Sequence, residues 1–384
     1  MDRLKKKILY IHHAGELGGA PKSLSILLNG LDKKFFESTV FMLIDGPAKV
    51  LFENVCDKVI VSKKRLFAFH GTTVSGMSFR LFVKNLLFII PNAIAAYRVI
   101  KKTKPQLIHL NTSCLFIYAL VAKLFFKNIK IVCHVREPLL ENFHGNILKF
   151  FNNKYCDFFI PINEYEAEPF KKNKYKVIRN SIDTSLYHFN KDIRAEQREN
   201  YRIIESDFVI GFFARFNLEN GIQDLSNLAN ALNPDIKILV FGYEPNGLYQ
   251  KEIDIANSMP NNVVLNGMIS DVNIKMQMID LLLSPFKTPH FSRAMIEAQS
   301  LSIPVIASNI GSQNTLLRDG ETGYLYEVGA IQDLKNKITF LKSNKEILSK
   351  MKFEARNFAL DMFDQSKNNE MVYSIYKDLL KIKC

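Results

Sequence analysis

Residues 284–311 constrain the fold more than any other stretch of the sequence. The stretch begins at the end of one short apolar run, IDLLLSPF, and ends with a second, LSIPVIAS, and both have the length and composition of buried strands. Between them Ser292 is a candidate N-cap, followed by apolar residues at near-helical spacing. The stretch therefore predicts a strand, a loop, a helix and a second strand.

The loop and the helix start in this unit also predict a ligand site. The N–H groups of the first helical turn and the positive end of the helix dipole point at the loop, where an anion can bind. Glu297, one turn into the helix, can accept hydrogen bonds from ribose hydroxyls, and Arg293 adds a cation. The alternative is an ordinary crossover of a parallel sheet, in which Glu297 is a solvated helix residue.

The same alternation of short apolar runs and helical segments recurs along the 384-residue chain, which is long enough for two domains with buried cores. Further strands are predicted at 6–13, 38–44, 58–63, 105–113, 128–137, 155–163, 207–216, 236–246, 263–270 and, as an edge, 322–329. The pattern predicts an α/β fold of two doubly wound parallel-sheet domains facing each other across a cleft.

Domain boundaries follow from a change in charge balance near the segment KVIRNSID. We expect residues 1–183 to form the first domain and residues 184–364 the second. A closing helix over about 365–384 is expected to pack back on the first domain. The polar segment at 190–200 is predicted to lie on the surface, and residues 80–104 are predicted to be helical.

Composition indicates a globular protein, with 47% apolar and 23% charged residues. No uninterrupted apolar stretch of about 18 residues predicts a membrane-spanning helix, and the N-terminus enters a strand directly, so no signal peptide is expected. The five cysteines are odd in number and follow no metal or redox spacing, so we expect reduced cytosolic thiols.

Positive charge is concentrated in the first half of the chain. Residues 1–183 contain 29 Lys and Arg against 14 Asp and Glu, and the span from Lys58 to Arg136 contains 14 basic residues and no acidic one. An anionic bilayer attracts such a segment by roughly 1 kcal/mol per nearby cation. The alternatives are solvated helix faces or a nucleic-acid surface, and for the latter no recognition motif is present.

Polar residues stand at the ends of three predicted strands in the first half. Asn111, His134 and Arg136 follow apolar runs, and ligands of open parallel sheets bind beyond the carboxyl ends of the strands. A glycine-rich turn at Gly15, Gly18 and Gly19 lets backbone approach a ligand. Its spacing is not the GxGxxG fingerprint, which disfavours a dinucleotide-dependent dehydrogenase.

Several segments resemble, in order, the landmarks of glycosyltransferase family 4, the retaining nucleotide-sugar transferases with two Rossmann-like domains in the GT-B fold. These segments are GELGGAPKSLSILLNGL, HVRE, VIRNSID, GFFARFNLENGIQDL, SPFKTPHFSRAMIEAQSLSIPVIASNIG and RDGETGYLYEVG. The resemblance covers almost the whole chain. The six segments in this order are far more specific than any single segment.

Two positions depart from the pattern of the family. The family normally has a Lys five residues after the Arg of its donor loop, and here Arg215 is followed at that place by Asn220. It also has two Glu eight residues apart, of which Glu297 fills the second position and Pro289 stands at the first. Either the donor is held differently, or the chain is a weakened or non-catalytic relative.

The resemblance implies a set of functional residues. The implied catalytic residues are His134, Arg215 and Glu297. The implied donor-binding residues are Gly18, Gly19, Asn220, Ile269, His290, Phe291, Ser292, Arg293 and Ala294. The implied acceptor-binding residues are Asn111, Arg136 and Glu137. No metal ligand and no cofactor are expected, because the donor is a nucleotide-diphosphate sugar and no convincing DxD pair is present.

The function expected from these features is transfer of a hexosyl-type sugar to a lipid-linked or polysaccharide glycan acceptor. The enzyme is expected to be cytoplasmic and peripheral on the inner face of the membrane, where it acts in capsule or lipopolysaccharide assembly. A second hypothesis is a sugar-nucleotide or glycan-binding scaffold without activity, and a third is a nucleic-acid-binding protein. The expected partners are therefore a nucleotide sugar, a glycan acceptor and an anionic membrane surface, and not nucleic acid.

Overall fold

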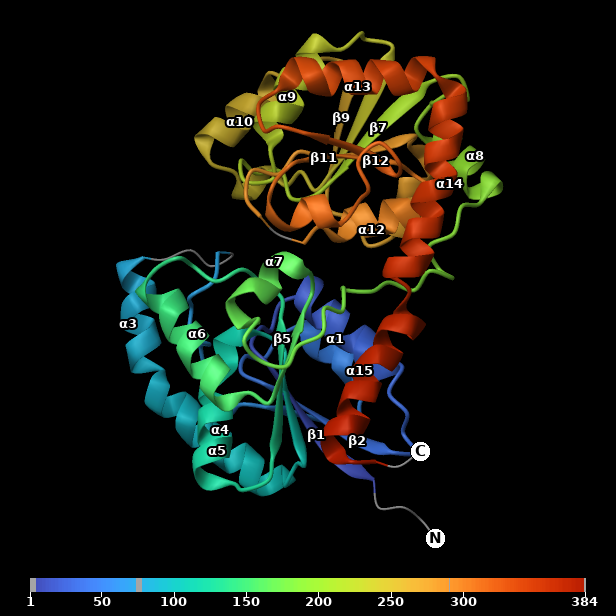
Figure 1. Ribbon diagram of the computed structural model, residues 1–384. Coiled ribbons are helices and arrows are strands. Elements are labelled where there is room, and N and C mark those ends of the chain that lie inside the picture. Colours follow the sequence, from blue (N-terminus) through green and yellow to red (C-terminus); the bar gives the residue numbers. More distant parts are fainter. Residues whose placement is uncertain (1–4, 74–77, 290, 383–384) are drawn as a thin grey trace. The chain divides into compact units, whose positions relative to one another are not determined.

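The computed structural model describes residues 5–73, 78–289 and 291–382, and it divides the chain into two units (Figure 1). Unit 1 consists of residues 1–181 together with 365–384, and unit 2 consists of residues 182–364. The first division falls two residues before the expected one. The last helix of the chain therefore belongs to the same unit as the first strand.

Unit 1 is built on a six-stranded sheet in the order β3-β2-β1-β4-β5-β6, in which every pairing is parallel. Its strands are β1 Lys6–His12, β2 Phe36–Met42, β3 Lys58–Val61, β4 Leu107–Leu110, β5 Lys130–Val135 and β6 Phe158–Pro161. Their near-continuous apolar sequences are typical of parallel strands covered on both faces.

Helices cover both faces of this sheet (Figure 1). They are α1 Gly19–Asn29, α2 Ala48–Glu53, α3 Phe79–Leu87, α4 Ile89–Thr103, α5 Phe116–Phe125, α6 Phe143–Tyr155, α7 Glu164–Ala167 and α15 Gln365–Leu380. Successive residues of β1 point to opposite faces, so Leu9 and Ile11 join the core under α4, α5 and α6. Ile8 and Tyr10 join the core under α1, α2 and α15.

Unit 2 has a second six-stranded parallel sheet, in the order β12-β11-β10-β7-β8-β9. Its strands are β7 Phe208–Phe213, β8 Ile236–Phe241, β9 Val263–Asn266, β10 Leu281–Ser284, β11 Val305–Ser308 and β12 Gly323–Tyr326. Read from the β9 edge, the strands of unit 2 lie in the order third, second, first, fourth, fifth and sixth along the chain. The strands of unit 1 have the same order. Both units therefore have the doubly wound topology of a Rossmann-like domain.

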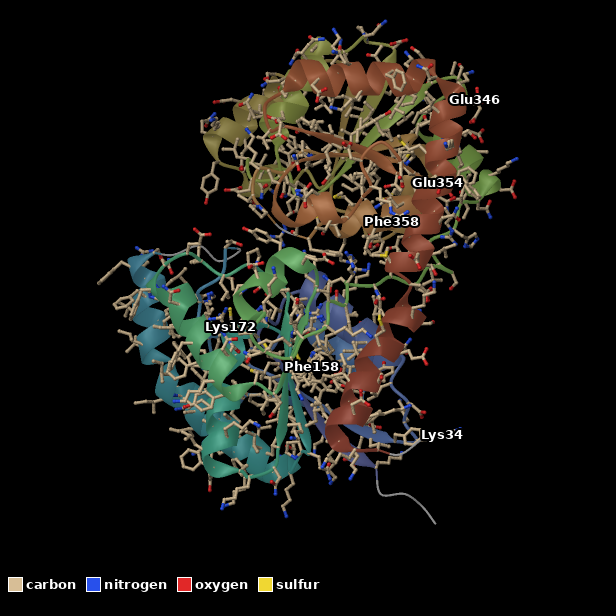
Figure 2. All side chains as sticks on the ribbon, in the orientation of Figure 1. Lys34, Phe158, Lys172, Glu346, Glu354 and Phe358 are labelled. Carbon is tan, nitrogen blue, oxygen red and sulfur yellow. The ribbon has the colours of Figure 1, made fainter. Side chains whose placement is uncertain are left out.

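The helices of unit 2 also lie on both faces of their sheet (Figure 1). They are α8 Lys191–Asn200, α9 Ile222–Ala231, α10 Gln250–Asn257, α11 Val272–Lys275, α12 Arg293–Ser300, α13 Ile331–Ser343 and α14 Lys345–Met362. The long helix α14 is amphipathic: Figure 2 labels Phe358, which is buried, and Glu346, which is exposed. Burial of the apolar face, rather than helix propensity alone, stabilises such a helix.

All twelve predicted strands are confirmed, and two helical expectations need correction. The predicted helical segment at 80–104 is broken at Phe88 into α3 and α4, which are bent by 42°. The polar segment at 190–200 is not simply surface. It forms α8, and Arg194 and Arg198 on that helix are buried.

Those two arginines are buried because they bind one carboxylate at the amino end of β10. Arg194 Nη2 and Arg198 Nη2 donate to Asp280 Oδ1 and Oδ2, each over 2.8 Å, and Val209 N also donates to Oδ2 over 3.0 Å. Lys352 Nζ lies 3.7 Å from Asp280 Oδ1. The cluster ties α8, α14 and the amino ends of β7 and β10 together, at the end of the sheet opposite the predicted ligand site.

The chain enters and leaves unit 2 at adjacent points. Ile182 N donates to Phe363 O over 2.9 Å, and Thr184 Oγ1 donates to Asp364 Oδ2 over 2.6 Å. The chain then forms α15, which packs against α1 in unit 1, where Asn369 Nδ2 donates to Ile26 O over 3.1 Å. Unit 2 is thus an insertion between the two segments of unit 1.

Candidate active site

The carboxyl ends of β1, β4 and β5 bring three of the expected residues of unit 1 into one hydrogen-bond network. Asn111 Oδ1 accepts from Arg136 Nε over 2.9 Å, and Asn111 Nδ2 lies 3.0 Å from His12 Nδ1. Arg136 Nη2 lies 3.3 Å from His134 Nδ1, and Arg136 Nη1 donates to Asn180 Oδ1. Asn111, His134, Arg136 and His12 are buried.

This network fixes the tautomer of His134. A guanidinium can only donate, so His134 Nδ1 must accept, and the neutral ring carries its proton on Nε2. That Nε2 has no hydrogen-bond partner among the residues that the structure describes. His134 lines a cavity of about 20 Å³ together with Arg136 and Asn180, which is room for roughly one water-sized group. The ring is therefore arranged to donate one hydrogen bond to an oxygen atom.

Burial keeps the imidazoles of this network uncharged. Desolvation, followed by the charges of Arg136 and His109, lowers the pKa of His134 well below its usual value. Burial likewise lowers the pKa of His12, and it lowers that of His109 to about 3. The neighbouring guanidinium is thus surrounded by neutral rings and amides. Such groups satisfy hydrogen bonds without adding a second buried cation.

Two carboxyl groups border this network. Glu137, expected at the acceptor, accepts from Thr112 Oγ1 over 3.2 Å. Glu166, at the start of α7, is 1% exposed, and neither of its oxygens has a hydrogen-bond partner among the described residues. Burial, assisted by the charges of Glu137 and Glu164, raises the pKa of Glu166 to about 8, so this carboxyl is protonated at neutral pH.

The glycine loop of unit 1 leads into α1. Gly18 is the N-cap residue, and a Cβ at this position would meet no atom within 4 Å, so the backbone is open to approach by a ligand. Gly19 is the first helical residue. Close packing requires a glycine at Gly15, because a Cβ there would stand 2.4 Å from Asp45 O. The donor-binding role of Gly18 and Gly19 stays a prediction.

In unit 2, the loop after β7 carries Arg215 and Asn220. The Arg215 side chain is exposed. Asn220 Nδ2 donates to Arg215 O over 2.8 Å, and Asn220 N donates to Asn217 Oδ1 over 2.9 Å. The residue that replaces the usual Lys therefore braces the loop that presents Arg215.

This loop is held against the end of β10 by close backbone packing. Gly221 has φ +83°, and a Cβ at this position would stand 1.7 Å from Pro285 O. Lys287 N donates to Glu219 O over 2.8 Å. Pro289, at the position of the usual first Glu, packs on Gly311, where a Cβ would stand 2.3 Å from Pro289 Cβ. Both departures from the family pattern thus have structural roles.

Helix α12 begins at Arg293, and Ser292 is its N-cap residue as predicted. The Ser292 side chain forms no capping hydrogen bond within the described part of the chain. Phe291, Ala294 and Ile269 border one apolar cluster that includes Met295 and Ile296. His290 lies outside the described residues.

Glu297 is almost entirely buried rather than solvated. It is 5% exposed, and its Oε1 accepts from Tyr187 Oη over 3.1 Å and lies 3.6 Å from Arg293 Nε. Burial, followed by the charge of Glu297, raises the pKa of the Tyr187 phenol above its usual range, which keeps the hydroxyl protonated as a donor. Two neighbours therefore hold this carboxylate in place, and its role at the ribose stays a prediction.

Sequence reasoning missed two residues that hold site residues in place. Tyr187 binds Glu297, and Thr112 binds Glu137. Thr112 directly follows Asn111 at a predicted strand end, which is a usable signal. Tyr187 lies 110 positions from Glu297, so no local pattern pairs them.

Two family models match successive parts of the chain. The model described as "Glycosyltransferase Family 4" matches residues 17–186, and the model described as "Glycosyl transferases group 1" matches residues 193–358. The first match covers β2 to β6 of unit 1 and ends just inside unit 2, and the second covers all six strands of unit 2. Together they cover most of the chain.

Curated relatives match at low identity. N-acetyl-alpha-D-glucosaminyl L-malate synthase of Bacillus anthracis is 26% identical over 57% of this chain and 58% of its own length. The capsular polysaccharide biosynthesis glycosyltransferase CapM of Staphylococcus aureus is 25% identical, over 55% of this chain and 57% of its own length. UDP-Gal:alpha-D-GlcNAc-diphosphoundecaprenol alpha-1,3-galactosyltransferase of Escherichia coli is 26% identical, over 40% of each. The alignments thus cover at most 58% of the length of each of these three relatives.

A solved structure matches over nearly the full length. Anabaena Alr3699/HepE, crystallised in complex with UDP, has a TM-score of 0.80 and 21% identity, over 97% of this chain and 100% of that one. With the strand order of both sheets and the two family models, this likeness defines the class as GT-B. The chain belongs to the GT-B glycosyltransferases of the family 4 type.

Proposed function

We propose that the chain transfers a hexosyl residue from a nucleotide-diphosphate sugar to a lipid-linked or polysaccharide glycan, with retention of anomeric configuration and without an obligatory metal ion. The observation that carries this proposal is the pair of family models, one on each doubly wound sheet. In this proposal unit 2 binds the donor and unit 1 the acceptor.

On the donor side, the diphosphate leaving group gains negative charge as its bond to the sugar breaks. Preorganised positive groups aimed at that charge are a large source of catalysis. The exposed Arg215 guanidinium and the first-turn amides of α12 supply such groups within unit 2. Glu297, fixed by Tyr187 and Arg293, accepts from the ribose hydroxyls.

On the acceptor side, His134 Nε2–H donates to an oxygen of the transferred sugar or of the acceptor. Arg136 and Asn111 hold the ring in the required tautomer. The neutral ring polarises a hydroxyl or ring oxygen through its Nε2–H, and the positive charge of the network is carried by Arg136 at the Nδ1 side of the ring. Arg136 is thus a positioning residue that acts through His134.

The acceptor class is supported by relatives and by surface chemistry. One relative, by its name, acts on a diphosphoundecaprenol-linked sugar, and another takes part in capsule synthesis. Helices α3 and α4 expose Phe79, Leu87 and Ile90, within the span that contains no acidic residue. No single described helix is long and apolar enough to cross a membrane, and only the bent pair α3 and α4 passes that test together. We propose that this surface docks on the anionic inner face of the membrane.

The test is transfer by the purified chain. A thermal-shift screen with UDP, GDP, ADP and CMP sugars selects the donor, because a bound ligand raises the melting temperature. Transfer to a lipid-linked glycan is then measured with and without EDTA, and the anomeric configuration is read by NMR. Glu297→Ala is expected to lower kcat/KM by about 10²-fold or more, whereas exposed Glu321→Ala leaves it unchanged. Wild-type turnover of a folded Glu297→Ala variant would contradict the site.

A second function is favoured by Asn220 and Pro289. Asn220 gives its side-chain amide to the loop backbone, and Pro289 fills space against Gly311, so neither offers the Lys or Glu usual in the family. A sugar-nucleotide or glycan-binding scaffold would need neither. Binding of a donor sugar with no hydrolysis and no transfer, even with acceptor present, would establish the scaffold and reject the enzyme.

A further inference from the structure

A groove in unit 1 lies apart from the hydrogen-bond network of His134 and Arg136. It has a volume of about 180 Å³, and the surface that lines it is apolar. Six of the residues that line it are Phe82 and Leu86 of α3, Phe116 and Leu120 of α5, and Phe143 and Phe151 of α6. An apolar cavity of about 150 Å³ can hold a benzene molecule. The groove therefore holds a short length of hydrocarbon and leaves the rest of a longer chain outside.

The polar groups beside the groove do not make it a polar site. Asn85 is bonded to backbone, since it accepts from His70 N over 2.8 Å and donates to His70 O over 2.7 Å. His144 serves as an aromatic wall, and its ring centroid lies 5.5 Å from that of Phe82 in an edge-on arrangement. A ligand in this groove is thus recognised by apolar contact.

The mouth of the groove is exposed on two helices. Leu86 is 54% exposed and Phe143 is 68% exposed, and both line the groove. Large exposed apolar side chains that surround a groove mark an interaction site rather than an ordinary surface. A chain that enters the groove would cover both residues.

The groove adjoins the predicted acceptor residues. Phe69 lines it, and Phe69 N donates to Cys114 O over 3.2 Å, next to Thr112 and Asn111. The same segment continues to Gly71, whose carbonyl accepts from Leu140 N over 2.9 Å. Leu140 follows Arg136 and Glu137 by only a few residues. One ligand can therefore have its polar end at these strand ends and its apolar end in the groove.

Charge around the groove fits an anionic head group. The four helices that bound it contain no Asp or Glu. Their cations are Arg80, Lys84, Arg98, Lys101, Lys102, Lys123, Lys149 and Lys154. A second copy of the chain is a poor occupant, because an isologous contact would place two such cationic faces against each other.

We propose that this groove binds the hydrocarbon chain of a lipid-linked acceptor, close to its phosphate head group. The inference rests on the proposed function for the identity of the acceptor. It adds a binding site for the lipid part of that acceptor. The chemistry recognised is a prenyl-type or acyl chain joined to a phosphate or diphosphate.

The test uses the absence of tryptophan from the sequence. Phe143→Trp places a single indole at the mouth of the groove, and Phe150→Trp places one on the same helix at a residue that is 58% exposed and does not line the groove. Titration of the full chain with farnesyl phosphate should give a saturable blue shift of the first indole. The second indole should not respond.

A matched pair of charge variants then tests the site. In the Phe143→Trp background, Leu86→Asp is expected to raise the Kd for farnesyl phosphate about tenfold or more, because it charges the apolar mouth. Leu124→Asp, at a 62% exposed residue of α5 that does not line the groove, should change the Kd less than about twofold. Circular dichroism and melting temperature check that each variant is folded.

Several outcomes would overturn the inference. A shift of both indoles by phosphatidylglycerol vesicles, with none by farnesyl phosphate, would mean bulk bilayer contact. A blue shift that grows with protein concentration without any probe would mean self-association. Equal effects of Leu86→Asp and Leu124→Asp would mean non-specific binding.

The test is independent of catalysis, because it contains no donor sugar. Probe binding at the groove by a chain that transfers nothing would leave the groove established and reject the proposed enzyme. Sugar transfer to lipid-linked acceptors by a chain whose groove variants behave like wild type would support the proposed enzyme and reject the groove as the lipid site.

Discussion

The two units have the same strand order but differ in the partners of their buried charged groups. In unit 2 two buried carboxylates are paired with arginines: Asp280, at the amino end of β10, lies between Arg194 and Arg198, and Glu297 lies beside Arg293. In unit 1 the carboxyl ends of the strands carry one buried guanidinium among neutral imidazoles and amides, and the buried carboxyl of Glu166 is protonated.

The difference shows that topology and site chemistry are separable. Parallel strands of the same order deliver side chains to the same edge in both units. The units differ in the residues that flank their strands, such as Asp280 before β10 in unit 2 and Arg136 after β5 in unit 1. The following predictions test whether charge is handled in this way.

The largest effect is expected at Asp280. Asp280→Ala leaves Arg194 and Arg198 buried without their shared carboxylate, and it should lower the free energy of unfolding by about 3–5 kcal/mol. Urea denaturation measures the change. Asp333→Ala in the same unit removes an exposed pair with Lys337 and should cost less than about 1 kcal/mol. Similar losses in the two variants would show that burial does not set the strength of these pairs.

The next effect concerns pH and Glu166. Its carboxyl loses a proton near pH 4.5 when unfolded and near pH 8 when folded, so the native state binds more protons between these values. Stability from this group is fully present below about pH 4.5, falls as the pH rises, and is lost above about 8. Glu166→Gln keeps a neutral side chain at every pH. At pH 9 its free energy of unfolding should therefore be roughly 2–4 kcal/mol higher than that of the wild type.

The measurement is urea denaturation of both proteins at pH 4 and pH 9. The difference between them should nearly vanish at pH 4. Glu168→Gln, two residues further on and with a largely exposed side chain paired to Lys171, should show no such pH dependence. If the two variants respond to pH alike, the Glu166 carboxyl is ionised in the folded state and unit 1 is not a neutral site.

The smallest effect is expected at Tyr187. Tyr187→Phe removes the hydroxyl that donates to Glu297 Oε1, and it should cost about 1 kcal/mol of unfolding free energy. Tyr249→Phe, at an 80% exposed residue of the same unit, is the control and should cost nothing measurable. Thermal denaturation at pH 7 compares them. Equal stability of the two variants would mean that the buried Glu297 does not depend on Tyr187.

The strands were predictable because each is a short, nearly continuous apolar run that ends at polar residues. The break at Phe88 was not, since the sequence on both sides of it has helical character and packing decides where the axis bends. The burial of Arg194 and Arg198 could also not be predicted from the sequence. Their partner Asp280 lies more than 80 positions away, so the sequence alone predicts the polar segment at 190–200 to be surface.

For the candidate site, order along the chain and the residue after each strand identified Asn111, His134 and Arg136. The sequence also shows that Asn220 stands where a Lys is usual. It does not show that the Asn220 amide turns back to bind Arg215 O, because that depends on loop geometry. Partnerships between distant residues, such as Tyr187 with Glu297, require the fold itself.

The insertion of unit 2 within unit 1 has a consequence for synthesis on the ribosome. The core under α1 needs Val372, Tyr373 and Tyr376 from α15, and these are made only after all of unit 2. At about 5–20 residues per second, the 183 positions of unit 2 delay them by roughly 10–40 s. Unit 2 is continuous and can fold as soon as it emerges. The nascent first half must wait with part of its apolar surface uncovered, which makes it the segment most exposed to chaperones and to misfolding.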